Sequence, residues 1–158
     1  MALSPRLSAV AALVRPGATV ADIGTDHARL PIHLVRQGLV CHCIASDVAA
    51  GPLCKAAENL AAAGLTDAIE LRQGNGLFCF SPDEVDDIVI AGMGGETVAE
   101  ILADSAFSFS ARHRLILQPM SHPERLAAWL DAAGFSVLPP CIVAEGRRQY
   151  TVFYASFS

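Results

Sequence analysis

The sequence has 158 residues, a hydrophobic fraction of 53%, a mean hydropathy of +0.41 and a formal net charge of −5. The length fits one domain with a full core, and no run approaches the roughly 18 consecutive apolar residues that a membrane span needs. The negative charge excludes a fold that is basic overall and binds nucleic acid through its whole surface. Because the first residues lack the pattern of a signal peptide, we expect a cytoplasmic protein with a single domain over residues 1–158.

Helical and extended patterns alternate along the chain. Apolar periodicity, together with proline and glycine at the ends, predicts helices over residues 4–14, 27–37, 51–63, 96–103 and 124–133. Apolar runs rich in β-branched residues predict strands over residues 19–23, 39–46, 68–72, 87–91, 114–117, 135–138 and 150–155. This alternation predicts an α/β fold with a mostly parallel seven-stranded sheet, an antiparallel hairpin of the last two strands at one edge, and an N-terminal helix (1–15) packed on it.

The first expected strand runs into a loop with the sequence Asp22-Ile23-Gly24-Thr25-Asp26-His27, and a helix follows at once. Glycine lets a backbone approach a ligand, and a helix N-terminus offers free N–H groups, so this is the pattern of a nucleotide-cofactor loop. The dinucleotide fingerprint would need glycine at positions 26 and 29, and a pyrophosphate would meet two carboxylates, Asp22 and Asp26. A cationic cofactor without phosphate, S-adenosylmethionine, suits this loop better, and a nicotinamide-dependent oxidoreductase is the less favoured alternative.

Three further strand ends have residues suited to the same ligand, and such ends meet at one edge of a parallel sheet. Asp47 follows Gly24 by 23 residues, close to the separation of about 20 at which an acid reaches ribose hydroxyls. Asn75, between Gly74 and Gly76, can face an adenine edge, and residues 91–95 leave room for a flat substrate. Simpler interpretations stay open: Asp22 as a turn cap, Asp47 as an N-cap, and the glycines as turn residues only.

Five cysteines, at positions 41, 43, 54, 79 and 141, form an odd number without C-x-x-C spacing. Cys41 and Cys43 share one face of an expected strand while His42 points to the other, and no second ligand pair follows. We therefore expect no metal site and interpret the cysteines as core residues of a protein from a reducing compartment.

Several motifs together resemble one family over nearly the whole chain. They are Leu3–Leu7, Ala21–Ala28, Arg72–Leu77, Ala-Gly-Met-Gly-Gly at 91–95 and Leu-Ile-Leu-Gln-Pro at 115–119. The sequence is similar to the bacterial TrmK-type tRNA (adenine-22-N1)-methyltransferases. The resemblance implies a class I, Rossmann-like methyltransferase fold that binds S-adenosyl-L-methionine and methylates N1 of an adenine in the tRNA D-arm.

The resemblance also implies roles for individual residues. The cofactor would contact Asp22, Gly24, Thr25, Asp26, His27, Asp47, Val48, Gly74, Asn75, Gly76, Ala91, Gly92 and Met93. The tRNA substrate would contact Arg6, Gly94, Gly95, Gln118 and Pro119. Our hypothesis for catalysis is that the Asp26 carboxylate stabilises the cationic product, while His27 or Arg29 positions the base or a phosphate.

Family members continue into a helical C-terminal domain thought to help grip tRNA, whereas this sequence stops at Ser158, soon after the last expected strand. Binding of the tRNA partner is therefore expected to be weak or partial, with no membrane and no metal involved. A second hypothesis follows: an S-adenosylmethionine-binding module that is inactive without such a domain.

Overall fold

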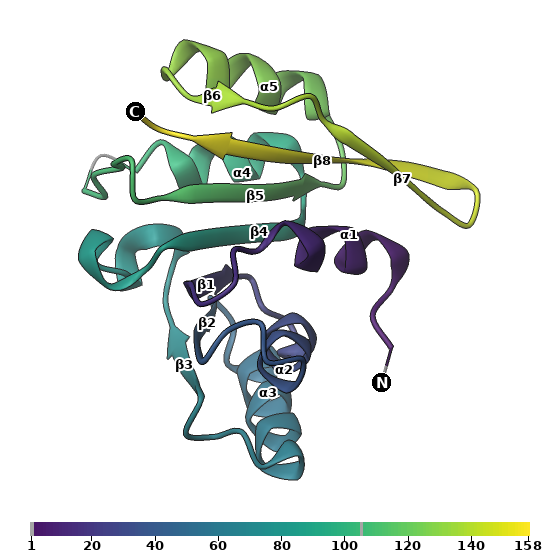
Figure 1. The fold of residues 1–158 in the computed structure, drawn as a ribbon, viewed down its shortest axis with the longest axis vertical. Coiled ribbons are helices and arrows are strands. Elements are labelled where there is room, and N and C mark those ends of the chain that lie inside the picture. Colours follow the sequence, from purple (N-terminus) through teal and green to yellow (C-terminus); the bar gives the residue numbers. More distant parts are fainter. Residues whose placement is uncertain (1, 105) are drawn as a thin grey trace.

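The structure, a computed structural model of the chain, describes residues 2–104 and 106–158 (Figure 1). Its helices are α1 Pro5–Leu13, α2 Arg29–Arg36, α3 Ala50–Ala63, α4 Gly95–Leu102 and α5 Pro123–Ala132, with 3₁₀ turns η1 Gly76–Cys79 and η2 Pro82–Glu84. Its strands are β1 Thr19–Ile23, β2 His42–Asp47, β3 Ile69–Gln73, β4 Asp87–Met93, β5 Arg114–Pro119, β6 Ser136–Val137, β7 Cys141–Glu145 and β8 Arg148–Ser156. None of these helices is long and apolar enough to cross a membrane.

The strands form one twisted sheet in the order β3-β2-β1-β4-β5-β8-β6. Strands β1 to β5 are parallel, and β8 pairs antiparallel with β5, β6 and β7. The chain order reverses between β1 and β4, which is the point at which such sheets bind their ligands. The predicted α/β, Rossmann-like fold is confirmed.

Helices cover both faces of the sheet, so the molecule has three layers. Figure 1 shows α1 crossing in front of β4, whereas α4 lies behind β5. Alternate strand residues supply the two cores: Val20, Val89 and Ile116 pack with α1, α2 and α3, and their neighbours Ala21 and Ile88 pack with α4 and α5. Because both of their faces are buried, the central strands β1 and β4 have mostly apolar sequences, whereas the edge strand β3 is only partly buried and contains Glu70 and Arg72.

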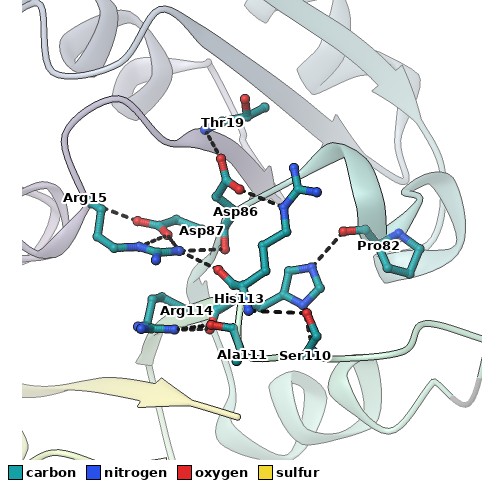
Figure 2. Close-up of polar contacts among 10 residues, drawn as sticks. Arg15, Thr19, Pro82, Asp86, Asp87, Ser110, Ala111, His113 and Arg114 are labelled. Carbon is teal, nitrogen blue, oxygen red and sulfur yellow. Dashed lines mark hydrogen bonds and ion pairs between the residues drawn. The ribbon is translucent and has the colours of Figure 1, made fainter. Parts of the chain in front are cut away.

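The segment after α1 is fixed to the amino-terminal edge of the sheet by an ion pair between the partly exposed Arg15 and the buried Asp87. Arg15 donates from Nε to Oδ1 of Asp87 at 2.8 Å and from its backbone N to Oδ2 at 2.8 Å (Figure 2). The neighbouring Asp86 accepts from the backbone N of Thr19 and from Nε of Arg112. Burial would raise the pKa of Asp86, but these two hydrogen bonds and the nearby arginines hold it below its ordinary value. This network lies at the edge of the sheet opposite to the carboxyl ends of the strands.

The structure corrects three expectations. It adds a strand, β7, so the described residues form eight strands instead of seven. β7 joins β8 through a two-residue turn at Gly146, and this hairpin extends beyond the sheet in Figure 1. Helix α2 starts two residues later than expected because Ala28 adopts a left-handed φ of 59°. Of the five cysteines only Cys43 is buried, whereas Cys41, Cys54 and Cys141 are exposed, so the interpretation of all five as core residues was wrong.

Candidate functional site

A cavity of about 600 Å³ lies at the carboxyl ends of β1 to β4. Its lining includes the following residues from the sequence-based hypothesis: Arg6, Gly24, Asp26, Asp47, Val48, Gly74, Asn75, Gly76, Ala91, Gly92 and Met93. The structure therefore brings the four expected strand ends to one place. Their assignment to particular ligand atoms stays a prediction.

The loop after β1 is held over the end of β2 by its backbone. The N–H groups of Gly24 and Thr25 both donate to the carbonyl of Ser46 at 2.9 Å. Gly24 has a φ of +73°, and a Cβ at this position would overlap the terminal methyl group of Met93. The backbone conformation therefore favours glycine at position 24, and any side chain there would push the end of Met93 out of its place at the cavity.

Asp22 lies beneath this loop, 5% exposed, and lines a smaller cavity of about 80 Å³ together with Thr25 and Asp26. Its Oδ2 accepts a 2.7 Å hydrogen bond from the Thr25 hydroxyl. Burial raises the pKa of Asp22 from 3.8 to about 6; the Thr25 hydrogen bond lowers it, and the negative charge of Asp47 raises it. A positively charged ligand group nearby would favour the ionised form of this carboxyl.

Asp47 ends β2 at the rim of the cavity. Its Oδ1 accepts from the backbone N of Ala49 at 3.2 Å, and its Oδ2 lies 3.4 Å from the backbone N of Asp26. The alternative interpretation of Asp47 as an N-cap is wrong, because the N-cap of α3 is Ala49, two residues later. Neither contact buries the carboxylate, so its remaining acceptor positions stay available to a ligand.

The wall formed by the loops after β2 and β3 combines an amide with two exposed apolar side chains. Asn75 is exposed between Gly74 and Gly76, and Gly74 N donates to the Asp47 carbonyl at 3.0 Å. Phe78 and Val48, which are 71% and 62% exposed, line the same cavity. Large apolar side chains left in water at a concave site are typical of a binding surface for a flat ring.

An arginine that forks between two glutamates supports this wall from behind. Arg72 donates to both carboxylate oxygens of Glu84 at 2.7 and 2.8 Å, to Glu70, and to the Cys79 carbonyl at 2.6 Å. The hydrogen bonds from Arg72 lower the pKa of Glu84 to about 2 against the effect of partial burial. The loop bearing Asn75 leaves β3 at Gln73, and the hydrogen bond from Arg72 to Cys79 holds its other end against the same strand.

The glycine-rich segment after β4 divides into two parts. The register with β5 shifts between Ala91 and Met93, and Gly92 has a φ of +89° in a bulge that faces the cavity. Gly94 and Gly95 begin α4 and do not line the cavity. A Cβ at Gly95 would overlap the backbone carbonyls of Ser121 and His122, so this glycine permits close packing of two segments.

Arg6 reaches the cavity from α1. Its Nη1 donates to Oε1 of Gln118 at 2.8 Å, and its backbone N donates to Glu145 on β7. Gln118 and Pro119 are buried behind Arg6 and do not line the cavity themselves. Of the predicted substrate contacts, Arg6 therefore borders the main cavity, whereas Gln118 positions it.

His27 and Arg29 lie beside the main cavity, not in it. Both line a separate cavity between α2 and α3, and Arg29 also borders the small cavity next to Asp26. The His27 Nε2 lies 3.6 Å from Oδ1 of Asp26, and its Nδ1 lies 3.5 Å from Nη2 of Arg29. Their predicted catalytic roles can therefore act only through Asp26 or on a part of a substrate outside the main cavity.

Sequence reasoning missed the contribution of α4. Thr97, Glu100 and Ile101 line the cavity, and their spacing of three and one residues places them on one face of α4; Asp104, just beyond the end of the helix, lines it as well. That periodicity was visible in the sequence, but nothing in it showed that this face turns toward the cofactor loop. Ile23, Ser46, Leu77 and Phe78 complete the unpredicted lining.

The charges of the lining residues are strongly unequal. Four carboxylates, those of Asp26, Asp47, Glu100 and Asp104, face one arginine, Arg6. This arrangement favours a cationic ligand and disfavours a pyrophosphate. Across residues 2–104 and 106–158, no group of three or more His, Cys, Asp or Glu side chains is arranged to hold a metal ion.

Comparison with known proteins gives the same fold over almost the whole chain. Residues 3–153 match the sequence model of a family described as a methyltransferase domain. A curated tRNA (adenine(22)-N(1))-methyltransferase of Bacillus subtilis is 37% identical over 153 residues, which are 97% of this chain and 64% of the relative. The chain thus spans slightly less than two thirds of that relative's length.

Solved structures agree closely. The crystal structure of the B. subtilis m1A22 tRNA methyltransferase TrmK has a TM-score of 0.94 at 36% identity, covering 99% of this chain and 67% of that one. A Streptococcus pneumoniae protein solved in complex with S-adenosyl-L-methionine has a TM-score of 0.91 at 38% identity, covering 99% of this chain and 74% of that one. The chain belongs to the methyltransferase-domain family and, within it, to the TrmK-type tRNA (adenine-22-N1)-methyltransferases.

Proposed function

We propose that this chain transfers a methyl group from S-adenosyl-L-methionine to N1 of adenine 22 in the D-arm of tRNA. The observation that carries the proposal is the main cavity, in which four carboxylates face a single arginine at the carboxyl ends of four parallel strands. Such a site fits a cofactor that has a sulfonium and an ammonium group and lacks phosphate. The family membership supports the same substrate, and this substrate places the reaction in the cytoplasm.

The residues present fit this cofactor. The loop of Gly24 would receive the methionine end, with Asp22 and Asp26 near its ammonium group. Asp47 would accept from the ribose hydroxyls, because its carboxylate stands at the end of β2 with unused acceptor positions. The adenine would lie between Val48 and Phe78, whose exposed apolar surfaces face the cavity. Bound there, S-adenosylmethionine supplies an electrophilic methyl group.

The protein's part in catalysis is to align the base and to stabilise charge. N1 of adenine is already nucleophilic, so no base has to remove a proton first. Methylation leaves a positive charge on the base, and the exposed carboxylate of Asp26 would stabilise it electrostatically. Met93 would pack against the target base, which must be unstacked to enter the cavity.

The test is methyl transfer to an unmodified tRNA transcript, with the product nucleoside identified and located by mass spectrometry. We expect 1-methyladenosine at position 22, and no product with a matched transcript that has another base there. Asp26→Asn is expected to reduce the single-turnover rate at saturating cofactor at least about tenfold, equivalent to roughly 1.4 kcal/mol, and calorimetry measures its effect on cofactor affinity separately. Full activity of Asp26→Asn would refute the role of this carboxylate.

A second candidate function is an S-adenosylmethionine-binding module for which residues 1–158 do not suffice for methyl transfer. It is favoured by the four carboxylates of the main cavity, which suit a cationic cofactor but repel the phosphates of a tRNA strand. Cofactor binding without any 1-methyladenosine, even with enzyme in excess over tRNA, would support this alternative. A nicotinamide-dependent oxidoreductase is disfavoured by the same four carboxylates, and calorimetric titration with NAD tests it directly.

A further inference from the structure

A second cavity, of about 430 Å³, lies between α2 and α3 on the face of the sheet opposite to α4 and α5. Its polar lining comes from the loop residue His27, from one face of α2, and from Asn59 on α3; Leu3, Ile32, Ala62 and Ala63 supply its apolar part. It is separate from the main cavity, because the two cavities share no lining residue.

The charge of this second cavity is the reverse of that of the first. Its lining contains Arg29 and Arg36, which are always positive, and His27 and His33, which become positive when protonated. No lining residue is acidic, and α2 itself contains no aspartate or glutamate. In a chain with a net charge of −5, such a concentration of positive charge without a carboxylate marks a site for an anion.

The positive groups form a row and do not converge on one point. Arg29, His33 and Arg36 are separated by four and three residues on α2, so they share one helical face and extend about 10 Å along its axis. Both arginines are exposed, and no described carboxylate forms an ion pair with either. A row of this length matches successive negative charges along a polymer better than it matches a single small anion.

One end of the row touches the loop of the main cavity. Arg29 Nη2 lies 3.5 Å from His27 Nδ1, and the Asn59 side chain donates to the His27 carbonyl at 2.9 Å. His27 in turn contacts Asp26, which lines the main cavity. A polyanion bound along α2 therefore ends beside the place where the target base would enter.

We propose that the row of Arg29, His33 and Arg36 binds the phosphodiester backbone of the tRNA strand next to the methylated adenine. This inference rests on the proposed function for the identity of the RNA. The phosphates bound on α2 would fix the position of the strand, and the neighbouring nucleotide would turn into the main cavity. Arg36 lies at the far end of α2 from Asp26, so it would contribute to RNA binding without contacting cofactor or base.

Arg36→Gln and the charge reversal Arg36→Glu test this proposal. Arg112→Gln is the matched control, because Arg112 is an exposed arginine at the opposite edge of the sheet, paired with Asp86. Binding of an unmodified tRNA transcript is measured by fluorescence anisotropy between about 50 and 200 mM salt. Cofactor affinity by calorimetry and thermal unfolding of each variant confirm that the fold and the first cavity are intact.

Loss of one phosphate contact lowers the slope of log K against log salt by about 0.7 to 0.9, which corresponds to roughly sixfold weaker binding near 0.1 M salt. We expect this change for Arg36→Gln, a larger one for Arg36→Glu, and an unchanged slope for Arg112→Gln. Equal slopes for wild type and Arg36→Gln, or an equal loss in both glutamine variants, would overturn the inference.

The same samples separate this inference from the proposed function. If wild type forms 1-methyladenosine and Arg36→Glu binds tRNA equally well, the proposed function stands and the role of the row is refuted. If tRNA binds through Arg36 with the expected slope but no methyl transfer occurs, the row is supported and the catalytic proposal falls. Absence of any tRNA binding by wild type at the lowest salt overturns both.

Discussion

The Thr25 hydroxyl donates a 2.7 Å hydrogen bond to the buried carboxyl of Asp22, and it is the only side-chain partner of that carboxyl among the described residues. Burial and the nearby charge of Asp47 oppose ionisation more strongly than this hydrogen bond favours it, so the pKa rises to about 6. At neutral pH the chain therefore holds an ionised carboxyl in an unfavourable place. Binding of a cation would relieve this cost, which links the stability of the fold to occupancy of the site.

Asp22→Asn is expected to stabilise the cofactor-free protein at neutral pH. A carboxyl whose pKa rises from 3.8 to about 6 on folding binds more protons in the folded state, so its contribution to stability falls as pH rises through this interval. The variant lacks this loss, and its advantage should grow by about 2 kcal/mol from near pH 4.5 to near pH 7.5. Urea unfolding at both pH values measures it; an advantage independent of pH would contradict the role of ionisation. Cofactor affinity should fall in the same variant.

Gly24→Ala should impair both folding and cofactor binding. Alanine at a φ of +73° costs about 1 to 2 kcal/mol, and its Cβ would also displace Met93. Gly38→Ala is the matched control, since Gly38 has a φ of +69° and nothing within 4 Å of the added Cβ. We expect both variants to lose stability and only Gly24→Ala to lose cofactor affinity, by about tenfold or more in calorimetry. Equal cofactor affinity in both variants would refute the close approach at Gly24.

Phe78→Ala should weaken cofactor binding without destabilising the fold. The ring is 71% exposed, so its removal leaves no internal cavity, and the free energy of unfolding should change by less than about 0.5 kcal/mol. Loss of a stacking partner worth about 1 kcal/mol corresponds to roughly fivefold weaker binding. Leu138→Ala, at another exposed apolar residue outside the cavity, should change neither quantity. Unchanged affinity of Phe78→Ala would place the adenine elsewhere.

Asp87→Ala should have the opposite effect, a loss of stability at an intact site. Asp87 is fully buried and accepts both the backbone N and the guanidinium of Arg15, so its removal leaves these donors without their partner. We expect a loss of about 1 to 3 kcal/mol in urea unfolding, because the backbone N of Arg15 loses its acceptor, whereas the partly exposed guanidinium keeps the carbonyls of Asp86 and Arg112. Asp67→Ala, at an exposed turn, should be neutral. A changed cofactor affinity in Asp87→Ala would show that the two edges of the sheet are coupled.

The sheet and the four strand ends were predictable because their signals are local. Most of the parallel strands appear as apolar runs, and the first four are followed by an acid or glycine such as Asp47 or Gly74. Neighbouring residues in the sequence therefore indicate both the strand and the place where it ends. Since all parallel strands present their carboxyl ends at one edge, the grouping of these residues followed from topology alone. The cavity confirms that grouping, whereas the atom-by-atom roles remain predictions.

The positions of the cavity residues that the sequence did not predict, and that of His27, depend on the orientation of helices and side chains. Glu100 on α4 and Asp104 just beyond it line the cavity, and the position of α4 depends on contacts such as the close packing of Gly95 against the segment at Ser121, far away in the sequence. His27 was expected at the cofactor, but the left-handed conformation of Ala28 accompanies its placement on the side of α2. Sequence periodicity gives neither the angle of a helix nor the direction of a side chain after a turn.

The place of β8 in the sheet has a consequence for synthesis on the ribosome. β8 lies between β5 and β6, although it follows both in the chain, so the outer edge of β5 has no partner until residues 148–156 have emerged. An apolar strand with an open edge pairs readily with other chains. Ribosomal pausing between β5 and β8 would therefore leave this edge open to pairing with other nascent chains.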